Sequence, residues 1–254
     1  MDTSNDLRNR LKKGQTLSAS WLFLGSPVTT EILSTAGFDL LLLDREHAPG
    51  GLDTLYHQLR ATSVPVIVRL DSADPSQIKL ALDAGAQGIA VSNLSTGDQA
   101  RTLIAATRYV PDGTRGIQRL SRAARYGTDW ATYCTTTGAA PLSMAVIETV
   151  AGLENLDDIL SVDALDIIFI GAVDLAAGLG HLNDMTHPDV KEAITRIETR
   201  TRAAGKILGG LANAPQDAST KRARGYQLLS FGSDALFLRD GALAAAQHAR
   251  ETIS

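Results

Sequence analysis

Charged and imidazole side chains stand at the ends of four apolar segments in this sequence. Each segment is a nearly uninterrupted run of Leu, Ile and Val, which is typical of a parallel strand buried on both faces. Parallel strands of α/β folds carry their chemistry at their carboxyl ends. The side chains concerned are Asp44, Glu46, His47, Arg69, Glu148 and Asp174. Their positions predict one site to which several strands contribute.

Glu148 and Asp174 follow neighbouring predicted strands, so a barrel would bring the two carboxylates together over its mouth. Two hard oxygen ligands, with the remaining positions left to water and substrate, suit Mg²⁺ or Mn²⁺, with Co²⁺ as a further option, better than Zn²⁺. An aspartate after a strand also commonly caps the next helix. Metal binding and helix capping are therefore both open interpretations of Asp174.

Arg69 and His47 are the other candidates for catalysis. Arg69 ends a buried strand and needs an anion, which Glu46 or the carbonyl or carboxylate of a substrate could supply. Of the five histidines, only His47 stands at a strand end, where an imidazole can act as general acid or base. Asp83, near the end of a predicted helix, is a candidate to orient His47, although sequence alone does not show that contact.

Apolar runs and helical periods alternate along the whole chain. Strands are predicted at 17–23, 39–44, 65–70, 88–93, 143–149, 165–171, 206–212 and 227–234. Helices are predicted at 6–13, 29–36, 52–62, 76–84, 97–108, 151–160, 188–204, 216–224 and 236–252. No Pro/Ser-rich linker interrupts this order, which predicts one domain over residues 1–254, a single (β/α)8 TIM barrel with a short N-terminal helix.

Residues 109–141 form the one long irregular stretch. Connections of this length are usually functional loops. Because the stretch comes after the fourth predicted strand, we expect it on the face where TIM-barrel active sites form.

Composition excludes several classes of function. With 24 basic and 28 acidic residues the net charge is −4, so we expect no nucleic-acid partner. Cys134 is the only cysteine and has no partner for an internal disulfide, which fits a reducing compartment. The polar N-terminus lacks a signal core and no segment is apolar over a membrane-spanning length. The sequence predicts a cytoplasmic protein with no membrane contact.

Four segments, 43–49, 107–116, 146–149 and 169–175, resemble the signature blocks of the HpcH/HpaI family of class II, metal-dependent pyruvate aldolases. This family includes the 4-hydroxy-2-oxoheptanedioate, 2-keto-3-deoxyrhamnonate and 5-keto-4-deoxyglucarate aldolases. The resemblance runs in register from about residue 14 to the C-terminus. It implies that Glu148 and Asp174 bind the divalent metal and that Arg69 binds the keto oxygen of pyruvate. It further implies that His47, oriented by Asp83, moves the proton of the aldehyde-derived hydroxyl.

The resemblance also implies the substrate-binding groups and the reaction. Backbone amides around Gly171 and Ala172 would hold the carboxylate of the keto acid, pyruvate or oxaloacetate, and Trp21 would lie near the mouth. The implied reaction is reversible cleavage of a 4-hydroxy-2-keto acid to pyruvate and an aldehyde, in a homo-oligomer, hexamer or trimer, whose active sites a neighbouring subunit completes. A siderophore-type citrate synthase, an oxaloacetate decarboxylase and a non-catalytic keto-acid-binding barrel are alternatives. Lys206 only opens a strand, and no lysine lies inside one, which disfavours Schiff-base chemistry.

The chain departs from the family pattern at three places. The usual Gly-Pro-Ala-Asp reads Gly-Ala-Val-Asp at 171–174, and the usually apolar end of the fourth strand contains Ser92 and Asn93. Arg45 adds a cation beside His47, which would tend to depress the pKa of that imidazole or to attract an acidic substrate tail. These departures leave the identity of the substrate open.

Overall fold

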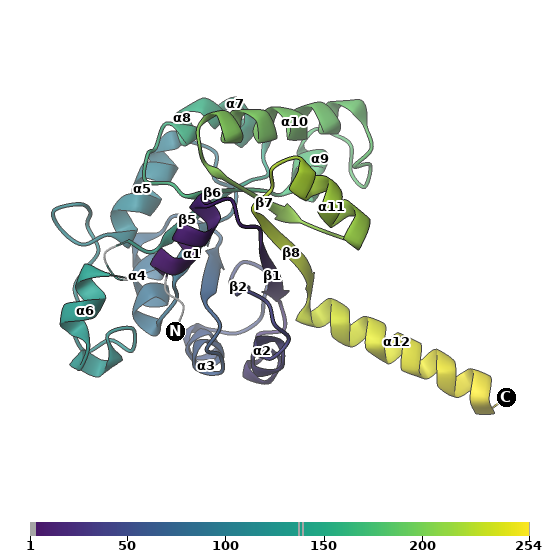
Figure 1. The fold of residues 1–254 in the computed structure, drawn as a ribbon, viewed down its shortest axis with the longest axis horizontal. Helices are drawn as coiled ribbons and strands as arrows, with labels where there is room; N and C mark the ends of the chain where they lie inside the picture. Colours follow the sequence, from purple (N-terminus) through teal and green to yellow (C-terminus); the bar gives the residue numbers. More distant parts are fainter. Residues whose placement is uncertain (1–3, 137, 139, 254) are drawn as a thin grey trace.

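Eight parallel strands close into a barrel in the computed structural model, which describes residues 4–136, 138 and 140–253. The strands follow one another around the barrel in chain order, and the last pairs with the first (Figure 1). They are β1 Leu17–Leu22, β2 Leu40–Asp44, β3 Val66–Leu70, β4 Gly88–Val91, β5 Leu142–Ile147, β6 Ile167–Ile170, β7 Ile207–Leu211 and β8 Leu228–Ser233. The predicted TIM barrel is confirmed.

Alternate residues of each strand face two different apolar clusters. In β2, Leu40 and Leu42 belong to the cluster that fills the barrel, whereas Leu41 and Leu43 pack under the surrounding helices. The N-terminal helix α1 (Ser4–Lys12) adds Leu7 and Leu11 to the inner cluster. Because α1 contributes apolar side chains to this cluster beside the start of β1, the amino end of the barrel is packed, and the carboxyl ends are left for the site.

The outer helices form where caps and apolar periodicity predict them. Ser26 and Asp74 cap α2 and α4 with their side chains, and each of these helices has proline at its first turn. Gly85 ends α4 with φ +109°, as a glycine C-cap requires. The helices after α1 are α2 Pro27–Ser34, α3 Leu52–Arg60, α4 Pro75–Ala84, α5 Gly97–Thr107, α6 Trp130–Thr135, α7 Val150–Glu154, α8 Leu156–Leu160, α9 Ala172–Gly178, α10 Pro188–Ala203, α11 Pro215–Ala223 and α12 Asp234–Ile253.

Three helical features differ from the sequence prediction. The segment predicted as one helix at 151–160 is two short helices, α7 and α8, which meet at Asn155. Helix α9 was not predicted, because it has only seven residues and ends in glycine. Helix α6 and a 3₁₀ turn at Arg125–Gly127 lie within the stretch predicted to be irregular, of which residues 137 and 139 fall outside the described part.

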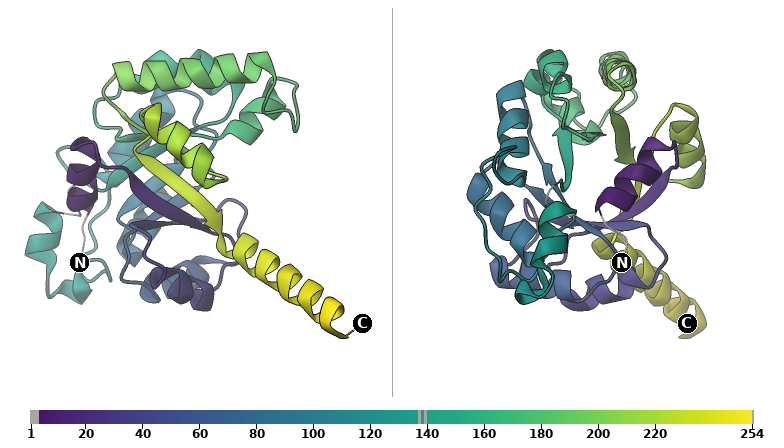
Figure 2. Two further views of the ribbon diagram at one scale, coloured as in Figure 1. Left: turned by 45° about the vertical axis from the view of Figure 1, so that its right-hand side comes forward. Right: turned by 60° about the vertical axis from the view of Figure 1, so that its left-hand side comes forward.

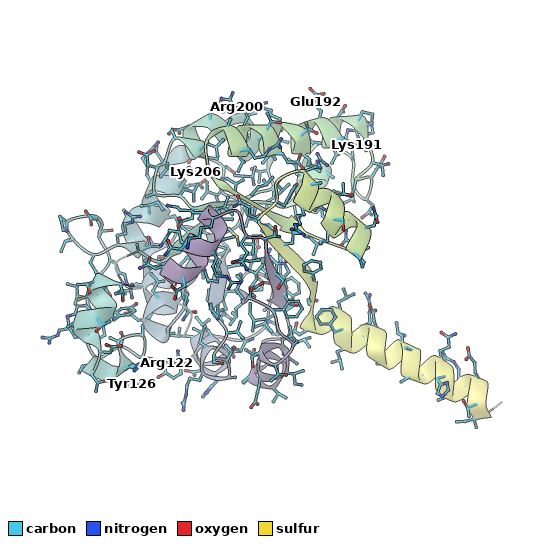
Figure 3. The ribbon with its side chains drawn as sticks, in the orientation of Figure 1. Arg122, Tyr126, Lys191, Glu192, Arg200 and Lys206 are labelled. Atoms are coloured by element: carbon cyan, nitrogen blue, oxygen red, sulfur yellow. The ribbon has the colours of Figure 1, made fainter. Side chains whose placement is uncertain are left out.

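The long stretch 109–141 does not lie on the active-site face. It follows α5 rather than β4 and leads into the start of β5, so it lies at the end of the barrel where the strands begin, and Arg122 donates there to the carbonyls of Ala84 and Leu59. Arg122 and Tyr126, which belong to it, lie low on the molecule beside α3 and α6 (Figure 3). The predicted face was wrong because helix α5 intervenes and carries the chain back across the barrel wall.

The last helix, α12, extends away from the barrel (Figures 1 and 2). Among its described residues only Asp234, at its start, is buried. Phe237, Leu238 and Leu243 are exposed apolar side chains on it. None of the helices in the described residues is both long enough and apolar enough to cross a membrane.

Candidate active site

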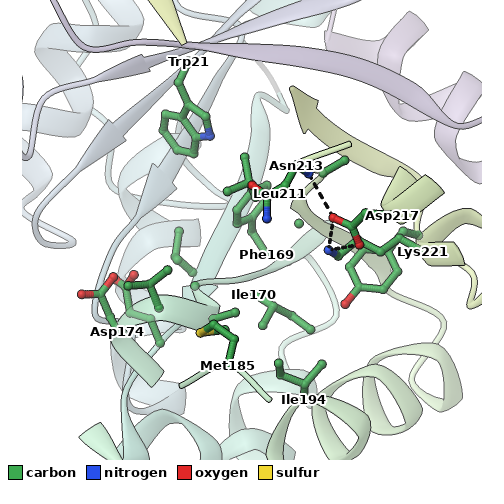
Figure 4. Close-up of a pocket in the computed structure, with 18 of the residues that line it drawn as sticks. Trp21, Phe169, Ile170, Asp174, Met185, Ile194, Leu211, Asn213, Asp217 and Lys221 are labelled. Atoms are coloured by element: carbon green, nitrogen blue, oxygen red, sulfur yellow. Dashed lines mark hydrogen bonds and ion pairs between the residues drawn. The ribbon is translucent and has the colours of Figure 1, made fainter. Parts of the chain in front are cut away.

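A cavity of about 1120 Å³ opens at the carboxyl ends of the strands and extends beside α10 and α11 (Figure 4). Its walls combine apolar side chains of the barrel interior with charged groups from the strand ends. Six of the eight predicted site residues line it, namely Trp21, Arg69, Glu148, Gly171, Ala172 and Asp174. The fold therefore brings most of the predicted site together.

Glu148 follows β5 directly and is only 5% exposed. Its Oε1 accepts a hydrogen bond from the backbone N–H of Asn93 at 2.7 Å. Burial raises the pKa of the Glu148 carboxyl to about 7; the Asn93 bond opposes this rise, whereas the charges of Glu46 and Asp174 add to it. A buried carboxyl beside other carboxylates gains from a divalent cation, which neutralises the mutual repulsion.

Asp174 is the third residue of α9, whose N-cap is Gly171. The helix-capping interpretation of Asp174 is therefore wrong, although a carboxylate in the first turn still interacts favourably with the helix dipole. Its side chain is exposed and borders the cavity (Figure 4). Glu148 and Asp174 thus follow two adjacent strands, β5 and β6, and border the same cavity, where their carboxylate oxygens would suit Mg²⁺ or Mn²⁺.

Gly171 makes room for Glu148. A Cβ atom at Gly171 would lie 2.5 Å from both Cβ and Oε2 of Glu148, so a side chain here would displace the carboxylate. The N–H of Gly171 donates to the carbonyl of Ile147 at 3.1 Å. Of the two amides predicted to hold a substrate carboxylate, that of Gly171 is therefore engaged within the fold, and the donors of the first turn of α9 begin with Ala172.

Two carboxylates orient Arg69. Its Nε donates to Oδ1 of Asp44 at 2.7 Å, and its Nη1 lies 3.2 Å from Oε2 of Glu46. The guanidinium carbon lies 4.6 Å from the ring centroid of Trp21. Trp21 in turn donates from Nε1 to Ser230 Oγ at 3.2 Å. The structural salt bridge between Arg69 and Glu46 is therefore present. Together with the pair to Asp44, it holds the guanidinium at the cavity wall.

Asp44 has a structural role that sequence analysis did not assign. It is fully buried, accepts the bond from Arg69, and also accepts the backbone N–H groups of Glu46 at 3.0 Å and His47 at 2.9 Å. Burial opposes ionisation, but the hydrogen bond and charge of Arg69, together with the two amides, lower the pKa of Asp44 below its ordinary value. The signal in the sequence was an acid that directly ends a run of four leucines.

Ser92 and Asn93, the polar departures after the fourth strand, position the carboxylates. Ser92 Oγ donates to Oε2 of Glu46 at 2.6 Å, and Asn93 Nδ2 donates to Oε1 of the same residue at 3.2 Å. Asn93 has φ +54°, a left-handed conformation that asparagine tolerates, and in this conformation its backbone N–H points at Glu148. These residues orient Glu148, which lines the cavity, and Glu46, which pairs with Arg69 at the cavity wall.

His47 and Asp83 are the two predicted residues that do not line the cavity. His47 is exposed over 69% of its side chain, and its Nε2 lies 3.6 Å from Oε2 of Glu46. Asp83 stands at the carboxyl end of α4, hence at the opposite end of the barrel, where its Oδ1 accepts from Arg115 Nη2 at 2.7 Å. The described residues of one chain do not bring Asp83 to His47, so the predicted contact would have to come from a second copy.

Lys206, Lys221 and Arg45 each pair with groups of the fold. Lys206 opens β7 at the amino end of the barrel, where its Nζ donates to the carbonyls of Val162 and Asp163 at 2.8 Å each (Figure 3). Lys221 lines the far part of the cavity and is paired with Asp217 at 2.7 Å (Figure 4). Arg45 donates from Nη2 to the carbonyl of Gly50 at 2.7 Å.

Comparison with known proteins shows the family of the chain. Residues 17–240 match the family described as HpcH/HpaI aldolase/citrate lyase. The 2-keto-3-deoxy-L-rhamnonate aldolase of Escherichia coli O157:H7 is 39% identical over 242 residues, which cover 93% of this chain and 90% of that protein. The crystal structure of an HpcH/HpaI aldolase/citrate lyase family protein from Burkholderia cenocepacia J2315 has a TM-score of 0.90 and 34% identity, and covers 97% of this chain and 99% of that one.

A third similar structure is the citrate synthase SbnG, with a TM-score of 0.87 and 26% identity over 97% of this chain and 98% of that one. The chain belongs to the HpcH/HpaI aldolase/citrate lyase family. It is a carbon–carbon lyase of the aldolase type, as predicted.

Proposed function

We propose that this chain is a divalent-metal-dependent aldolase that reversibly cleaves a 4-hydroxy-2-keto acid to pyruvate and an aldehyde. The observation that carries the proposal is the cavity in which the buried Glu148 lies with Asp174 and Arg69. The 39% identity to a 2-keto-3-deoxy-L-rhamnonate aldolase supports a sugar-derived keto acid as the substrate class.

Glu148 and Asp174 would hold the cation, Mg²⁺ or Mn²⁺, with Co²⁺ as a substitute. When bound, the cation supplies Lewis-acid stabilisation of the negative charge that develops on the keto acid. The elevated pKa of Glu148 supports this role, because a divalent ion offsets the repulsion from Glu46 and Asp174 that contributes to the elevation.

Arg69 donates to the keto oxygen, where negative charge develops as the C3–C4 bond breaks and its electron pair forms the C2–C3 double bond of the enolate. Trp21 and Phe169 exclude water from one wall of the cavity. The amides that begin with Ala172, at the first turn of α9, bind the keto acid's carboxylate. His47 accepts the proton of the C4 hydroxyl as the aldehyde carbonyl forms, and Asp83 of a second copy orients that imidazole.

The proposal is tested by exchange of the C3 protons of pyruvate with deuterated water, followed by NMR. We expect exchange with Mg²⁺ or Mn²⁺ and its loss with a chelator or in Glu148→Gln. The exposed Glu154, changed to Gln, is the matched control and should exchange normally. Exchange that survives the chelator, or an adduct with pyruvate trapped by borohydride, would refute the metal mechanism.

His47 acts on the other fragment in this scheme. His47→Gln should therefore leave pyruvate exchange intact while it slows cleavage of the hydroxy keto acid by roughly 100-fold or more. Equal loss of both activities would assign His47 to enolisation instead.

The acceptor is resolved by a substrate panel. Short and long aldehydes, acetyl-CoA and oxaloacetate, each assayed with the holoenzyme, separate an aldolase from a citrate synthase and from an oxaloacetate decarboxylase. Binding of pyruvate without exchange in any metal would indicate a keto-acid-binding barrel. We expect turnover with aldehydes and none with acetyl-CoA.

We also propose that the chain works as a cytoplasmic homo-oligomer, a hexamer or a trimer. The exposed Phe237, Leu238 and Leu243 on the extended helix α12 support self-association, since burial of these side chains is favourable. Light scattering after size exclusion should show an oligomer that dissociates in Phe237→Ser/Leu238→Ser, with circular dichroism unchanged. A monomeric wild-type chain would overturn this part of the proposal.

A further inference from the structure

Two histidines and an aspartate converge on the connection between α9 and α10, apart from the strand-end carboxylates. His181 Nε2 lies 3.0 Å from Asp189 Oδ2, and His187 Nδ1 lies 3.6 Å from the same oxygen. One ligand atom from each of the three side chains lies within 4.8 Å of the other two. Three groups that bind metals therefore meet at one point of the surface.

The backbone holds these residues in place. The N–H of His181 donates to the carbonyl of Ala176 at 2.8 Å, which ties the residue to the end of α9. His187 is the N-cap of α10, and its Nδ1 accepts from the N–H of Asp189 at 3.3 Å. The ends of two helices thus set the spacing of the cluster.

The donor set differs from that of the active site. Two imidazole nitrogens and one carboxylate oxygen are typical of zinc sites that retain a water in the fourth position. Glu148 and Asp174 offer only hard oxygens. We propose that His181, His187 and Asp189 form a separate binding site for Zn²⁺ or a divalent ion of the same class.

The two imidazole rings are stacked, with centroids 3.4 Å apart and 15° between their planes. Imidazole binds a metal through a lone pair in the plane of the ring, so coordination requires one ring to turn about χ2. This torsion is soft, and the side chains are exposed over 22% for His181 and 34% for His187, so the rotation has room on the surface. Asp189, at 63% exposed, leaves the fourth position to water.

The site is coupled to the cavity through Met185. This residue lies between the two histidines in sequence and lines the cavity with Asp174 (Figure 4). An ion held by His181 and His187 restrains the ends of the segment that carries Met185. The site is independent of the proposed reaction, since none of its ligands takes part in it.

The test uses the full chain with Glu148→Gln and Asp174→Asn, which removes the oxygen pair. Zn²⁺ titrated by calorimetry should bind one site per chain. His181→Gln or His187→Asn should weaken this binding by more than about 100-fold, because loss of a direct ligand exceeds the effect of outer-shell changes. Asparagine retains the N-cap of α10. The exposed His57 and His248, each changed to Asn, are matched controls and should leave binding unchanged.

Two results would overturn the inference. One is the absence of Zn²⁺ binding in the Glu148→Gln/Asp174→Asn chain, and the other is equal binding when His181 and His187 are replaced. Hydrogen exchange provides an independent measurement: Zn²⁺ should slow the amides of residues 182–186 in the wild-type chain and not in His187→Asn. Unchanged exchange in both would refute the restraint on Met185.

Discussion

Two arginine–aspartate pairs lie at opposite ends of the barrel and have the same length. At the carboxyl ends, Arg69 and Asp44 are 2.7 Å apart, and at the amino ends Arg115 and Asp83 are also 2.7 Å apart. Arg69 shares its guanidinium with Glu46 and faces the cavity. Arg115 lies under aromatic rings, with its guanidinium carbon 4.7 Å from the ring centroid of Tyr109 and Nη2 3.0 Å from the hydroxyl of Tyr133.

The two ends differ in charge balance. Burial raises the pKa values of Tyr109 and Tyr133, so both stay neutral, and the amino-end pair is balanced. The mouth carries the carboxylates Asp44, Glu46, Glu148 and Asp174 around Arg69. An ion pair alone therefore does not mark the site. The excess of carboxylates beside a cavity distinguishes the mouth, because a bound cation would offset their mutual repulsion.

The largest effect is expected from breaking the amino-end pair. Asp83→Ala leaves the buried Arg115 without its carboxylate and should lower the free energy of unfolding by about 3 to 5 kcal/mol, measured by urea denaturation. Pyruvate exchange by the folded chain should persist. Asp83→Asn, which keeps the shape and an acceptor, is the milder control.

The same variants examine the predicted role of Asp83 beside His47. If Asp83→Asn slows cleavage of the hydroxy keto acid as His47→Gln does, and leaves stability near wild type, Asp83 also acts on a neighbouring copy. A loss of stability with normal cleavage would limit it to the pair with Arg115.

A change to the pair at the mouth should lower the rate of pyruvate exchange more than it lowers stability. Arg69→Lys keeps a positive charge but loses the planar fork that binds Asp44 and Glu46, so pyruvate exchange should fall by roughly 100- to 1000-fold. Stability should change less than in Asp83→Ala. Arg115→Lys is the matched control, and we expect it to keep exchange and lose stability. Similar exchange rates in the two lysine variants would remove the distinction between the ends.

Glu148 gives the stability of the chain a pH dependence that originates at the mouth. Its pKa rises from 4.5 to about 7 on folding, so between these values the folded chain binds a proton that the unfolded chain has released. Without metal, the free energy of unfolding should therefore fall as pH rises from about 4.5 to about 7, by about 3 kcal/mol in all, and level off above that pH. Denaturation at a series of pH values measures the slope, which Glu148→Gln should abolish and Mg²⁺ should offset. An unchanged slope in the variant would assign it to another group.

Local sequence patterns were sufficient to predict the barrel and the strand-end positions of Arg69, Glu148 and Asp174, whereas Trp21, Gly171 and Ala172 were predicted from the family resemblance. A run of leucines predicts β2, and the capping residues predict α4. Both signals lie in residues that are close together in the sequence. The role of Asp44 could not be predicted in this way, because it depends on the register of β2 and β3, which places Asp44 directly opposite Arg69. The role of Asn93 depended on a left-handed backbone that aims its N–H at Glu148.

Asp83 shows how the order of helices and strands limits the contacts that one chain can make. A residue that closes a helix precedes the next strand, so it lies at the amino end of the barrel, away from any residue that follows a strand. The same topology puts the stretch 109–141 beside it, and that stretch supplies Arg115. Its partner could not be predicted because 32 residues separate the two side chains along the chain.

The smallest effect is expected at Ala172, where the chain departs from the family pattern. Ala172 is the first residue of α9, a position that accepts proline, so Ala172→Pro should raise the free energy of unfolding by about 0.4 to 1 kcal/mol. It also removes an N–H that we assign to the keto acid's carboxylate, and the KM for pyruvate should rise roughly tenfold, the value of one hydrogen bond to a charged group. Leu52→Pro, at the first position of α3, is the control and should leave KM unchanged. If Ala172→Pro stabilises the chain without altering KM, the carboxylate is bound by later amides of α9, and the departure affects rigidity at the mouth but not binding.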